Sequence, residues 1–325
     1  MLRGVLKRAE AGRIYGDPNR NSNAPGESPL LFHQHSGIFL DSLSVEIVLK
    51  EALEAISLRN ENVSPREINW LFEAATGLSR LDRMSKIDPA IDEASRLRFV
   101  QMCERRMVGE PVQYILGEAT FYGHSFRVNS SVLIPRPETE RIIEWVLNES
   151  GLHPGMKLLD VGTGSGCIPI TIALEKPGVE CSGVDISAEA LKVAKSNALA
   201  LEAGVQFFEM DVFSPAFDSI GGSPFDIVIS NPPYIPDVER ATLATEVKDH
   251  EPELALFCGS DPLLFYKRIS ELAPELLKKG GKVAVEVHAD FGVQVQSLFS
   301  EAGLRKVNLI NDLSGRERIV VAEVD

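Results

Sequence analysis

The chain has 325 residues, of which 44% are hydrophobic and 25% are charged, and its formal net charge at pH 7 is −14. This composition is typical of a soluble globular protein, and the length suggests about two domains. No apolar run in the sequence reaches the ~18 residues that would span a membrane. The excess of negative charge argues against tight, non-specific binding to a nucleic-acid backbone.

The four cysteines stand far apart in the sequence, at positions 103, 167, 181 and 258. Their spacing matches no zinc-binding pattern, and a chain of this length needs no disulfide bonds to stabilise it. We therefore expect reduced thiols, no metal site and a cytoplasmic protein.

Residues 1–40 are rich in glycine, proline, asparagine and serine, which is typical of a segment with little fixed structure. A cleaved transit peptide is the alternative, but Glu10, Asp17 and the lack of an amphipathic stripe argue against it. We predict a flexible extension over residues 1–40.

Residues 41–108 carry helical patterns. Apolar residues recur at helical spacing over 44–56. Residues 64–67 read Ser-Pro-Arg-Glu, which predicts a helix start with serine as the N-cap, and Gly77 predicts the end of that helix. With a third helix expected over 91–107, these patterns predict a small helical domain.

The pattern changes over residues 109–140. Gly117 and Gly123 flank aromatic residues, and the residues that follow alternate between apolar and polar. We predict a β-hairpin that links two domains, followed by a helix over 138–149.

From residue 157 onward, short apolar runs alternate with helical patterns. Such βα units predict an α/β domain over residues 141–325, with a doubly wound, mostly parallel sheet of seven strands. The last two strands have no helix between them, so one strand should run antiparallel. The strands are expected near 157–161, 180–184, 205–209, 225–230, 281–287, 304–309 and 317–323, and the helices near 166–175, 187–201, 261–278 and 290–302.

A glycine-rich turn follows the first of these strands. It lies between a predicted strand and a predicted helix, and its glycines let the backbone approach a ligand closely. The ligand-binding residues expected in this turn are Gly162, Thr163, Gly164, Ser165 and Gly166.

Acidic residues end the second and third strands. Asp185 is suited to hold the two hydroxyls of a ribose, and the alternative is a cap for the helix that follows Ser187. Asp211 can accept a hydrogen bond from the amine of an adenine while Val212 packs on the ring. These residues indicate a ligand that contains adenosine.

A dinucleotide and S-adenosylmethionine would both suit such a site. A pyrophosphate usually binds the pattern Gly-x-Gly-x-x-Gly, whereas residues 162–166 have the spacing Gly-x-Gly-x-Gly. S-adenosylmethionine has no phosphate, and acidic residues and aromatic faces suit its cationic sulfonium. The spacing therefore favours S-adenosylmethionine as the cofactor.

A second motif, Asn231-Pro232-Pro233-Tyr234, follows the strand predicted over 225–230. Open α/β sheets bind their ligands at the carboxyl ends of strands, where Asn231 would stand. The two prolines fix φ and remove two backbone donors, which leaves carbonyl oxygens to accept hydrogen bonds. A stiff turn with these acceptors and an aromatic ring suits a planar NH2 group, which an amino-directed methyltransferase must hold.

These motifs together resemble a known family. Residues 160–166 are similar to the first motif of class I S-adenosylmethionine-dependent methyltransferases, and residues 231–234 are similar to their amino-nitrogen-specific motif. The resemblance covers residues 42–325, and its most specific part is Pro-Arg-Pro-Glu-Thr-Glu at 135–140. Three further stretches resemble the peptide chain release factor N(5)-glutamine methyltransferases, namely 109–117, 133–140 and 312–318.

The resemblance implies methyl transfer from S-adenosylmethionine to the side-chain amide nitrogen of the glutamine in the Gly-Gly-Gln motif of peptide chain release factors. It implies that the glycine-rich turn, Asp185, Asp211 and Val212 bind the cofactor, with Asn231 beside it. The helical domain and the hairpin are then expected to recognise the release factor, which is the expected partner.

The resemblance also assigns the substrate site. It implies that Asn231, Pro232, Pro233 and Tyr234 bind the glutamine amide, and that Asn231, Pro232 and Tyr234 act in catalysis. The side-chain oxygen of Asn231 and the carbonyl of Pro232 would each accept one N–H and orient the nitrogen. Arg136 would position the substrate loop or pair with an acid of the partner, and the alternative is a surface arginine before a helix.

Three other functions would use similar motifs. An adenine N(6)-methyltransferase of DNA or RNA would have to flip a base into the pocket, and the net charge of −14 argues against it. A glutamine methyltransferase of a ribosomal protein is an alternative that the motifs leave open. A module that binds the cofactor without turnover is a third, and the intact motif at 231–234 argues against it.

Overall fold

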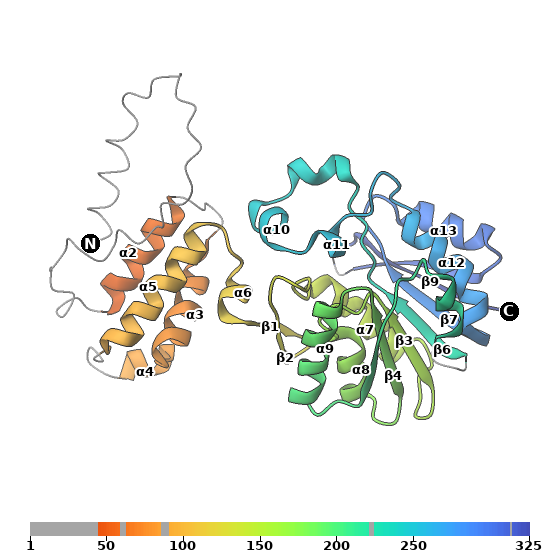
Figure 1. Cartoon of the computed structure of the whole chain (residues 1–325), viewed down its shortest axis with the longest axis horizontal. Coiled ribbons are helices and arrows are strands. Elements are labelled where there is room, and N and C mark those ends of the chain that lie inside the picture. Colours follow the sequence, from red (N-terminus) through yellow and green to blue (C-terminus); the bar gives the residue numbers. More distant parts are fainter. Residues whose placement is uncertain (1–44, 59–62, 86–90, 221–223, 313) are drawn as a thin grey trace, which may run out of the picture. The chain divides into compact units, whose positions relative to one another are not determined.

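The chain divides into two compact units, one up to Leu116 and one from Gly117 to Asp325. The extension predicted over 1–40 lies outside the described residues. Within the described part of the chain, no helix is long and apolar enough to cross a membrane. The residues that the computed structural model describes (Figure 1) are 45–58, 63–85, 91–220, 224–312 and 314–325.

The first unit is a group of helices around an apolar core. Ser64 and Glu67 form the predicted capping box, and Gly77 ends that helix in the left-handed conformation with φ 71°. Arg106 is buried in this unit and pairs with Glu67, with 3.2 Å between Nε and Oε2. The helices are α2 (Val45–Ser57), α3 (Pro65–Thr76), α4 (Arg80–Ser85), α5 (Glu93–Met107) and α6 (Val112–Leu116).

The region expected as a hairpin linker over 109–140 contains more than a hairpin. Helix α6, which the sequence analysis does not anticipate, belongs to the first unit and buries three of its five residues. The hairpin consists of β1 (Glu118–Phe121) and β2 (His124–Arg127), which pair antiparallel in the second unit. Its turn residues Tyr122 and Gly123 both have positive φ, as a two-residue turn of type I′ requires. The domain boundaries drawn from the sequence stay predictions.

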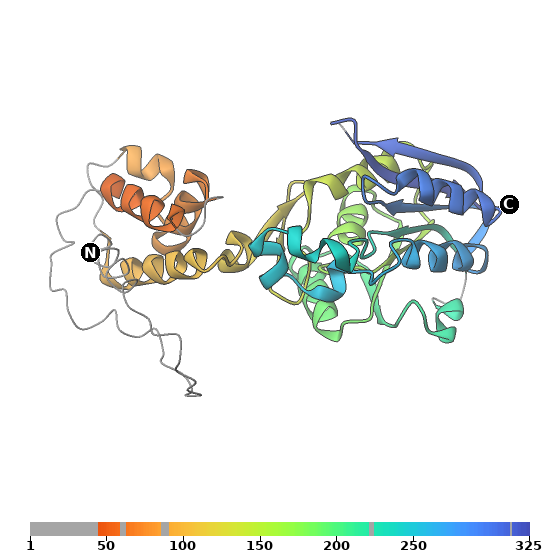
Figure 2. The same ribbon diagram turned by 90° about the horizontal axis from the view of Figure 1, so that it is seen from above.

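The second unit contains the predicted sheet of seven strands, in the order β5-β4-β3-β6-β7-β9-β8. Neighbouring strands from β5 to β7 are parallel, and β9 runs antiparallel to both β7 and β8. Figure 2 shows the blue C-terminal strands at one edge of this sheet. The strands are β3 (Lys157–Val161), β4 (Glu180–Asp185), β5 (Val205–Glu209), β6 (Phe225–Ser230), β7 (Leu277–Glu286), β8 (Arg305–Asn311) and β9 (Glu317–Glu323).

Helices cover both faces of the sheet, which confirms the doubly wound fold (Figure 1). Successive residues of β3 point to opposite faces, so Leu158 and Leu159 belong to different apolar cores. One face packs against α7 (Glu140–Asn148), α8 (Cys167–Glu175) and α9 (Ala188–Ala200), and the other packs against α12 (Leu264–Leu276) and α13 (Gly292–Glu301). The short helices are η2 (Pro137–Thr139), η3 (Pro215–Ser219), η4 (Asp237–Thr242), α10 (Thr245–His250) and α11 (Glu253–Leu256).

Candidate active site

The two motifs found in the sequence meet where the strand order reverses, between β3 and β6. Val161 of β3 pairs with Ser230 of β6, and the Ser230 hydroxyl donates a hydrogen bond to the Val161 carbonyl at 2.7 Å. The next residues therefore lie side by side, and a Cβ added to Gly162 would lie 4.0 Å from the backbone oxygen of Asn231. Open α/β sheets bind ligands at such a switch point.

The glycine-rich turn exposes bare backbone on one side. Gly162, Gly164 and Gly166 have φ of 79°, 54° and 78°, a region that favours glycine. A Cβ on Gly166 would lie 2.9 Å from Cδ1 of Ile170, so this glycine allows close packing at the start of α8. A Cβ on Gly164 would meet no heavy atom within 4 Å. This side of the turn can therefore accept a ligand.

Asp185, at the end of β4, holds the glycine-rich turn in place. Its Oδ2 accepts a hydrogen bond from the Gly164 N–H, and its Oδ1 accepts one from the Ser187 N–H, each at 2.9 Å. Helix α9 is capped by Ser187, so Asp185 is not the cap. Burial raises the pKa of Asp185, and the backbone donors oppose that rise. Each oxygen keeps lone pairs for a ribose hydroxyl, and the ribose contact stays a prediction.

Asp160 is a buried acid to which the sequence analysis assigns no role. It lies in β3 with 0% of its surface exposed. Within the described residues, neither of its carboxylate oxygens has a hydrogen-bond partner, and the hydroxyl of Thr163 has none either. Burial raises the pKa of Asp160 to about 7, and the charge of Asp185 adds to this rise. A buried acid without a partner, just before a bare turn, fits a cationic ligand.

Asp211 and Val212 follow β5 at the same edge of the sheet. The backbone oxygen of Asp185 accepts a hydrogen bond from the Met210 N–H at 3.0 Å, which ties this segment to the end of β4. Asp211 Oδ1 accepts a hydrogen bond from the Phe213 N–H at 2.9 Å, and Val212 packs against the apolar core on the α12 face. Their contacts with an adenine stay a prediction.

Asn231 belongs to a short chain of hydrogen bonds. Its Nδ2 donates to the hydroxyl oxygen of Thr139 at 3.1 Å, and that hydroxyl donates to Oε2 of Glu286 at 2.7 Å. The Tyr234 hydroxyl donates to the other carboxylate oxygen of Glu286 at 3.2 Å. One carboxylate therefore contacts Tyr234 directly and Asn231 through Thr139.

Glu286 ends β7 and is 1% exposed. Burial raises the pKa of Glu286, whereas hydrogen bonds from Thr139 and Tyr234 and the positive charge of Arg318 lower it. The pKa of Tyr234 is raised by burial and by the negative charge of Glu286, so this hydroxyl keeps its proton and donates. Sequence reasoning missed Thr139 and Glu286 as site residues because their partners are 92 and 147 residues away along the chain.

Arg136 pairs with an acid of its own chain. Its Nη2 lies 2.5 Å from Oε1 of Glu251, and the side chains are 33% and 1% exposed. The pair joins the residue before η2 to the segment that follows Tyr234. A contact between Arg136 and the substrate stays a prediction.

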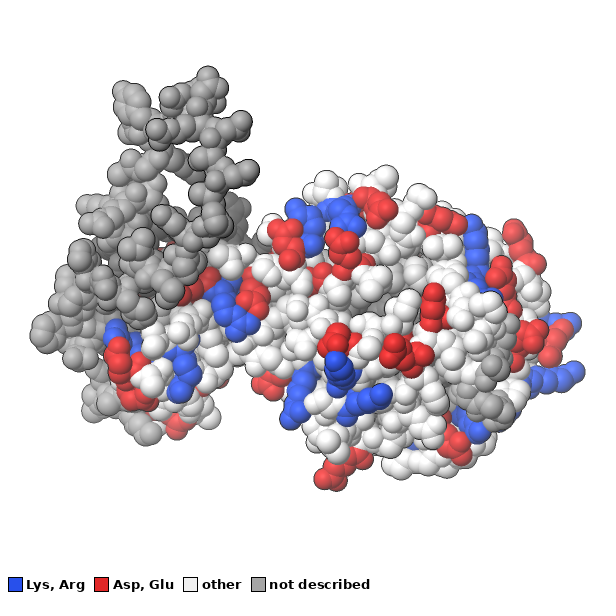
Figure 3. Space-filling view, in the orientation of Figure 1, with Lys and Arg blue, Asp and Glu red and all other residues white. Residues whose placement is uncertain are grey.

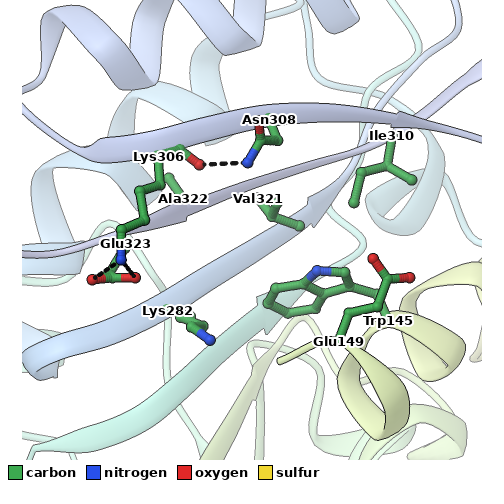
Figure 4. Close-up of a pocket in the computed structure, with 9 residues that line it drawn as sticks. All are labelled: Trp145, Glu149, Lys282, Lys306, Asn308, Ile310, Val321, Ala322 and Glu323. Carbon is green, nitrogen blue, oxygen red and sulfur yellow. Dashed lines mark hydrogen bonds and ion pairs between the residues drawn. The ribbon is translucent and has the colours of Figure 1, made fainter. Parts of the chain in front are cut away.

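A cavity of about 430 Å³ lies away from this site, over β7, β8 and β9 (Figure 4). Trp145 and Lys282 line it, and so does Lys306, which pairs with Glu323 at 2.9 Å. None of the residues that line it comes from the glycine-rich turn or from residues 231–234. The cavity is therefore separate from the candidate site.

The parallel sheet, the glycine-rich turn at its switch point and the Asn-Pro-Pro-Tyr motif beside it define a class I methyltransferase. The fold agrees with a solved structure, the hMettl16 catalytic domain in complex with MAT2A 3′UTR hairpin 6. The TM-score is 0.50 at 16% sequence identity, and the match covers 72% of this chain and 83% of that chain.

The sequence comparisons identify the family. The family model for the methyltransferase small domain matches residues 142–249, and the model for the PrmC N-terminal domain matches residues 48–117. The release factor glutamine methyltransferase of Chlorobaculum tepidum is 44% identical over 227 residues, which are 68% of this chain and 76% of that protein. The one of Bacillus subtilis is 39% identical over 272 residues, or 81% and 91% of the two chains. The chain belongs to the release factor glutamine methyltransferase family.

Proposed function

We propose that this protein transfers a methyl group from S-adenosylmethionine to the side-chain amide nitrogen of the glutamine in the Gly-Gly-Gln motif of peptide chain release factors. Membership of the family supports the substrate, and the state of the Asn231 side chain supports the chemistry. A substrate that acts in translation also supports a cytoplasmic location.

The observation that carries the proposal is the orientation of the Asn231 carboxamide. Its NH2 group donates to Thr139 at 3.1 Å, so its oxygen is directed elsewhere and can accept a hydrogen bond from a substrate. The next residue, Pro232, adds a backbone carbonyl, and neither proline of the motif has an N–H that would compete for an acceptor. Two acceptors on a stiff turn match the two donors of a primary amide.

This arrangement addresses the low reactivity of an amide nitrogen, whose lone pair is delocalised into the carbonyl. Asn231 and Pro232 would hold both N–H groups and favour the positive charge that develops on nitrogen as the N–C bond forms and the S–C bond breaks. The bound cofactor supplies the methyl group on a sulfonium. The nitrogen loses its extra proton after the transfer, so the site needs no strong base, and holding the nitrogen in line supplies part of the rate.

The residues proposed to hold the cofactor surround the ends of β3 and β4. The bare side of Gly164 allows close approach, and the remaining lone pairs of Asp185 suit ribose hydroxyls. The buried carboxyl of Asp160 suits a cation. We propose that Asp211 and Val212 contact the adenine.

We propose that the helical first unit and the hairpin recognise the release factor. Arg136 uses one nitrogen on Glu251 and keeps further N–H donors for a substrate. Acidic and basic side chains are interspersed over the described residues on the face shown in Figure 3. Such a mixed face suits a protein partner better than a nucleic-acid backbone.

A parallel labelling assay tests the function. The purified protein and radiolabelled S-adenosylmethionine are offered a release factor, ribosomes or DNA. We expect label on the release factor alone, and none on a release factor whose Gly-Gly-Gln glutamine is replaced by alanine. Label on a ribosomal protein or on DNA instead would overturn the proposal, and no label on any substrate would point to a binding module.

A further inference from the structure

The structure assigns a positioning role to Thr139 and Glu286, which lie outside the Asn-Pro-Pro-Tyr motif. We propose that Glu286, acting through Thr139, determines which way round the Asn231 carboxamide lies, so that its oxygen and not its NH2 group faces the substrate. This inference rests on the proposed function, because it concerns how the same site presents an acceptor to a substrate amide.

The direction of each hydrogen bond follows from the chemistry of the groups. A carboxylate only accepts, so the single proton of the Thr139 hydroxyl is committed to Oε2 of Glu286 at 2.7 Å. The hydroxyl oxygen can then only accept from its other neighbour, 3.1 Å away. Because only the NH2 end of the Asn231 carboxamide donates, that end faces Thr139 and the oxygen faces away.

The reversed arrangement would disable the site. If Glu286 carried a proton, Thr139 could accept from it and donate to the Asn231 oxygen instead. The carboxamide would then turn its NH2 group toward the NH2 group of the substrate, and two donors would face each other. The charge on Glu286 therefore sets the direction of both hydrogen bonds, from Asn231 to Thr139 and from Thr139 to Glu286.

Burial raises the pKa of Glu286 above its ordinary value, and a hydroxyl donor on each of its two oxygens opposes that rise. Tyr234 donates to its second oxygen at 3.2 Å, and the positive charge of Arg318 on β9 lowers the pKa of Glu286. The negative charge of Glu138 and the burial act in the opposite direction. Tyr234 of the motif thus supports the carboxylate that orients Asn231.

Both positioning residues are held firmly without substrate. Thr139 is 3% exposed and ends η2, where its N–H donates to the Arg136 carbonyl at 3.1 Å. Glu286 is 1% exposed, and its backbone carbonyl accepts a hydrogen bond from the Tyr266 hydroxyl at 3.0 Å. Preorganised groups of this kind spare the reaction the cost of ordering them. The Pro-Arg-Pro-Glu-Thr-Glu stretch at 135–140 thereby contributes to the site through its threonine.

Two substitutions of Thr139 test the inference. Thr139→Val keeps the shape and removes the hydroxyl, whereas Thr139→Ser keeps the hydroxyl. We expect Thr139→Val to lower kcat for a release factor by about tenfold or more, as for one lost orienting hydrogen bond. The dissociation constant for S-adenosylmethionine should stay close to that of the unchanged protein, and the melting temperature should fall by roughly a few degrees, because one oxygen of buried Glu286 loses its donor. Thr139→Ser should keep most of the activity.

The same substitution in a protein that also carries Asn231→Asp distinguishes orientation of the residue 231 side chain from general support of the fold. In Asn231→Asp the side chain has an acceptor at either end, so its orientation no longer matters. Removing the hydroxyl with Thr139→Val should then lower kcat much less than it does beside asparagine. An equal loss in both backgrounds would show that Thr139 only supports the fold, and would overturn the inference.

The remaining outcomes are distinct. Wild-type kcat in Thr139→Val, or equal losses in Thr139→Val and Thr139→Ser, would sink the inference and leave the proposed function intact. If the protein without any substitution transfers no label to a release factor, the proposed function itself is wrong. If Thr139→Val does not fold, Thr139→Ala also lacks the hydroxyl and is judged by the same results.

Discussion

Asp160→Asn should change how the stability of the ligand-free protein depends on pH. Burial raises the pKa of Asp160 from 3.8 to about 7, so the folded state holds a proton that the unfolded state has released. The stability that this proton contributes is fully present below pH 3.8 and is lost as the pH rises through about 7. At ~1.4 kcal/mol per pKa unit, the rise from 3.8 to about 7 corresponds to roughly 4 kcal/mol.

The effect can be measured as a difference between two variants at two pH values. Asparagine does not titrate, so the free energy of unfolding of Asp160→Asn, relative to the unchanged protein, should rise by roughly 2–3 kcal/mol between pH 5 and pH 8. The chain has two tryptophans, and Trp70 of the first unit is 47% exposed. A Trp70→Phe background leaves Trp145 as the reporter of the second unit during urea unfolding.

Two further measurements make this test sharper. Glu301→Gln removes an exposed carboxyl and serves as a matched control for the loss of one carboxylate. Asp160→Asn should also bind S-adenosylmethionine more weakly, because the amide cannot balance a cation. A stability difference that is the same at pH 5 and pH 8 would show that burial does not raise the pKa of Asp160.

Three other changes have clear expectations. Asn231→Ala should lower kcat by roughly 10²-fold with little change in cofactor affinity, because it removes one polarising group, and normal turnover would contradict its role. Asp185→Ala should weaken cofactor binding first, which calorimetry with S-adenosylmethionine would show, and an unchanged dissociation constant would refute the ribose contact. Gly183→Ala places a Cβ 2.6 Å from the Thr163 hydroxyl oxygen and should cost roughly 1–3 kcal/mol of stability. Gly204→Ala, with no heavy atom within 4 Å of the added Cβ, is the control, and equal melting temperatures would contradict the predicted overlap.

The sequence predicts those parts of the fold that depend on local pattern. The strands expected at 157–161, 225–230 and 317–323 have these same limits in the structure, because each is short and centred on neighbouring apolar residues. Helix α6 is missed because five residues are too short to show a helical period, and its burial depends on neighbours that are distant in sequence.

The sequence predicts only those residues of the site that directly follow a strand. The glycine-rich turn and Asn231 stand directly after strands, so the fold alone brings them to the switch point. Thr139 lies in the family-specific stretch 135–140, but nothing local assigns it or Glu286 a role, because these roles depend on contacts across 92 and 147 residues. Asp160 is recognisable in the sequence as an acid among apolar residues of a predicted strand. Only the structure shows that its carboxylate oxygens have no partner among the described residues.

A structure of the protein with the demethylated cofactor and a peptide that contains Gly-Gly-Gln would show directly how the glutamine amide is held. The glutamine side-chain nitrogen should lie within hydrogen-bond distance of both Asn231 Oδ1 and the Pro232 carbonyl, and face the sulfur. A peptide amide bound elsewhere, or an Asn231 that turns its NH2 group toward it, would show that Asn231 and Pro232 do not hold the glutamine in this way.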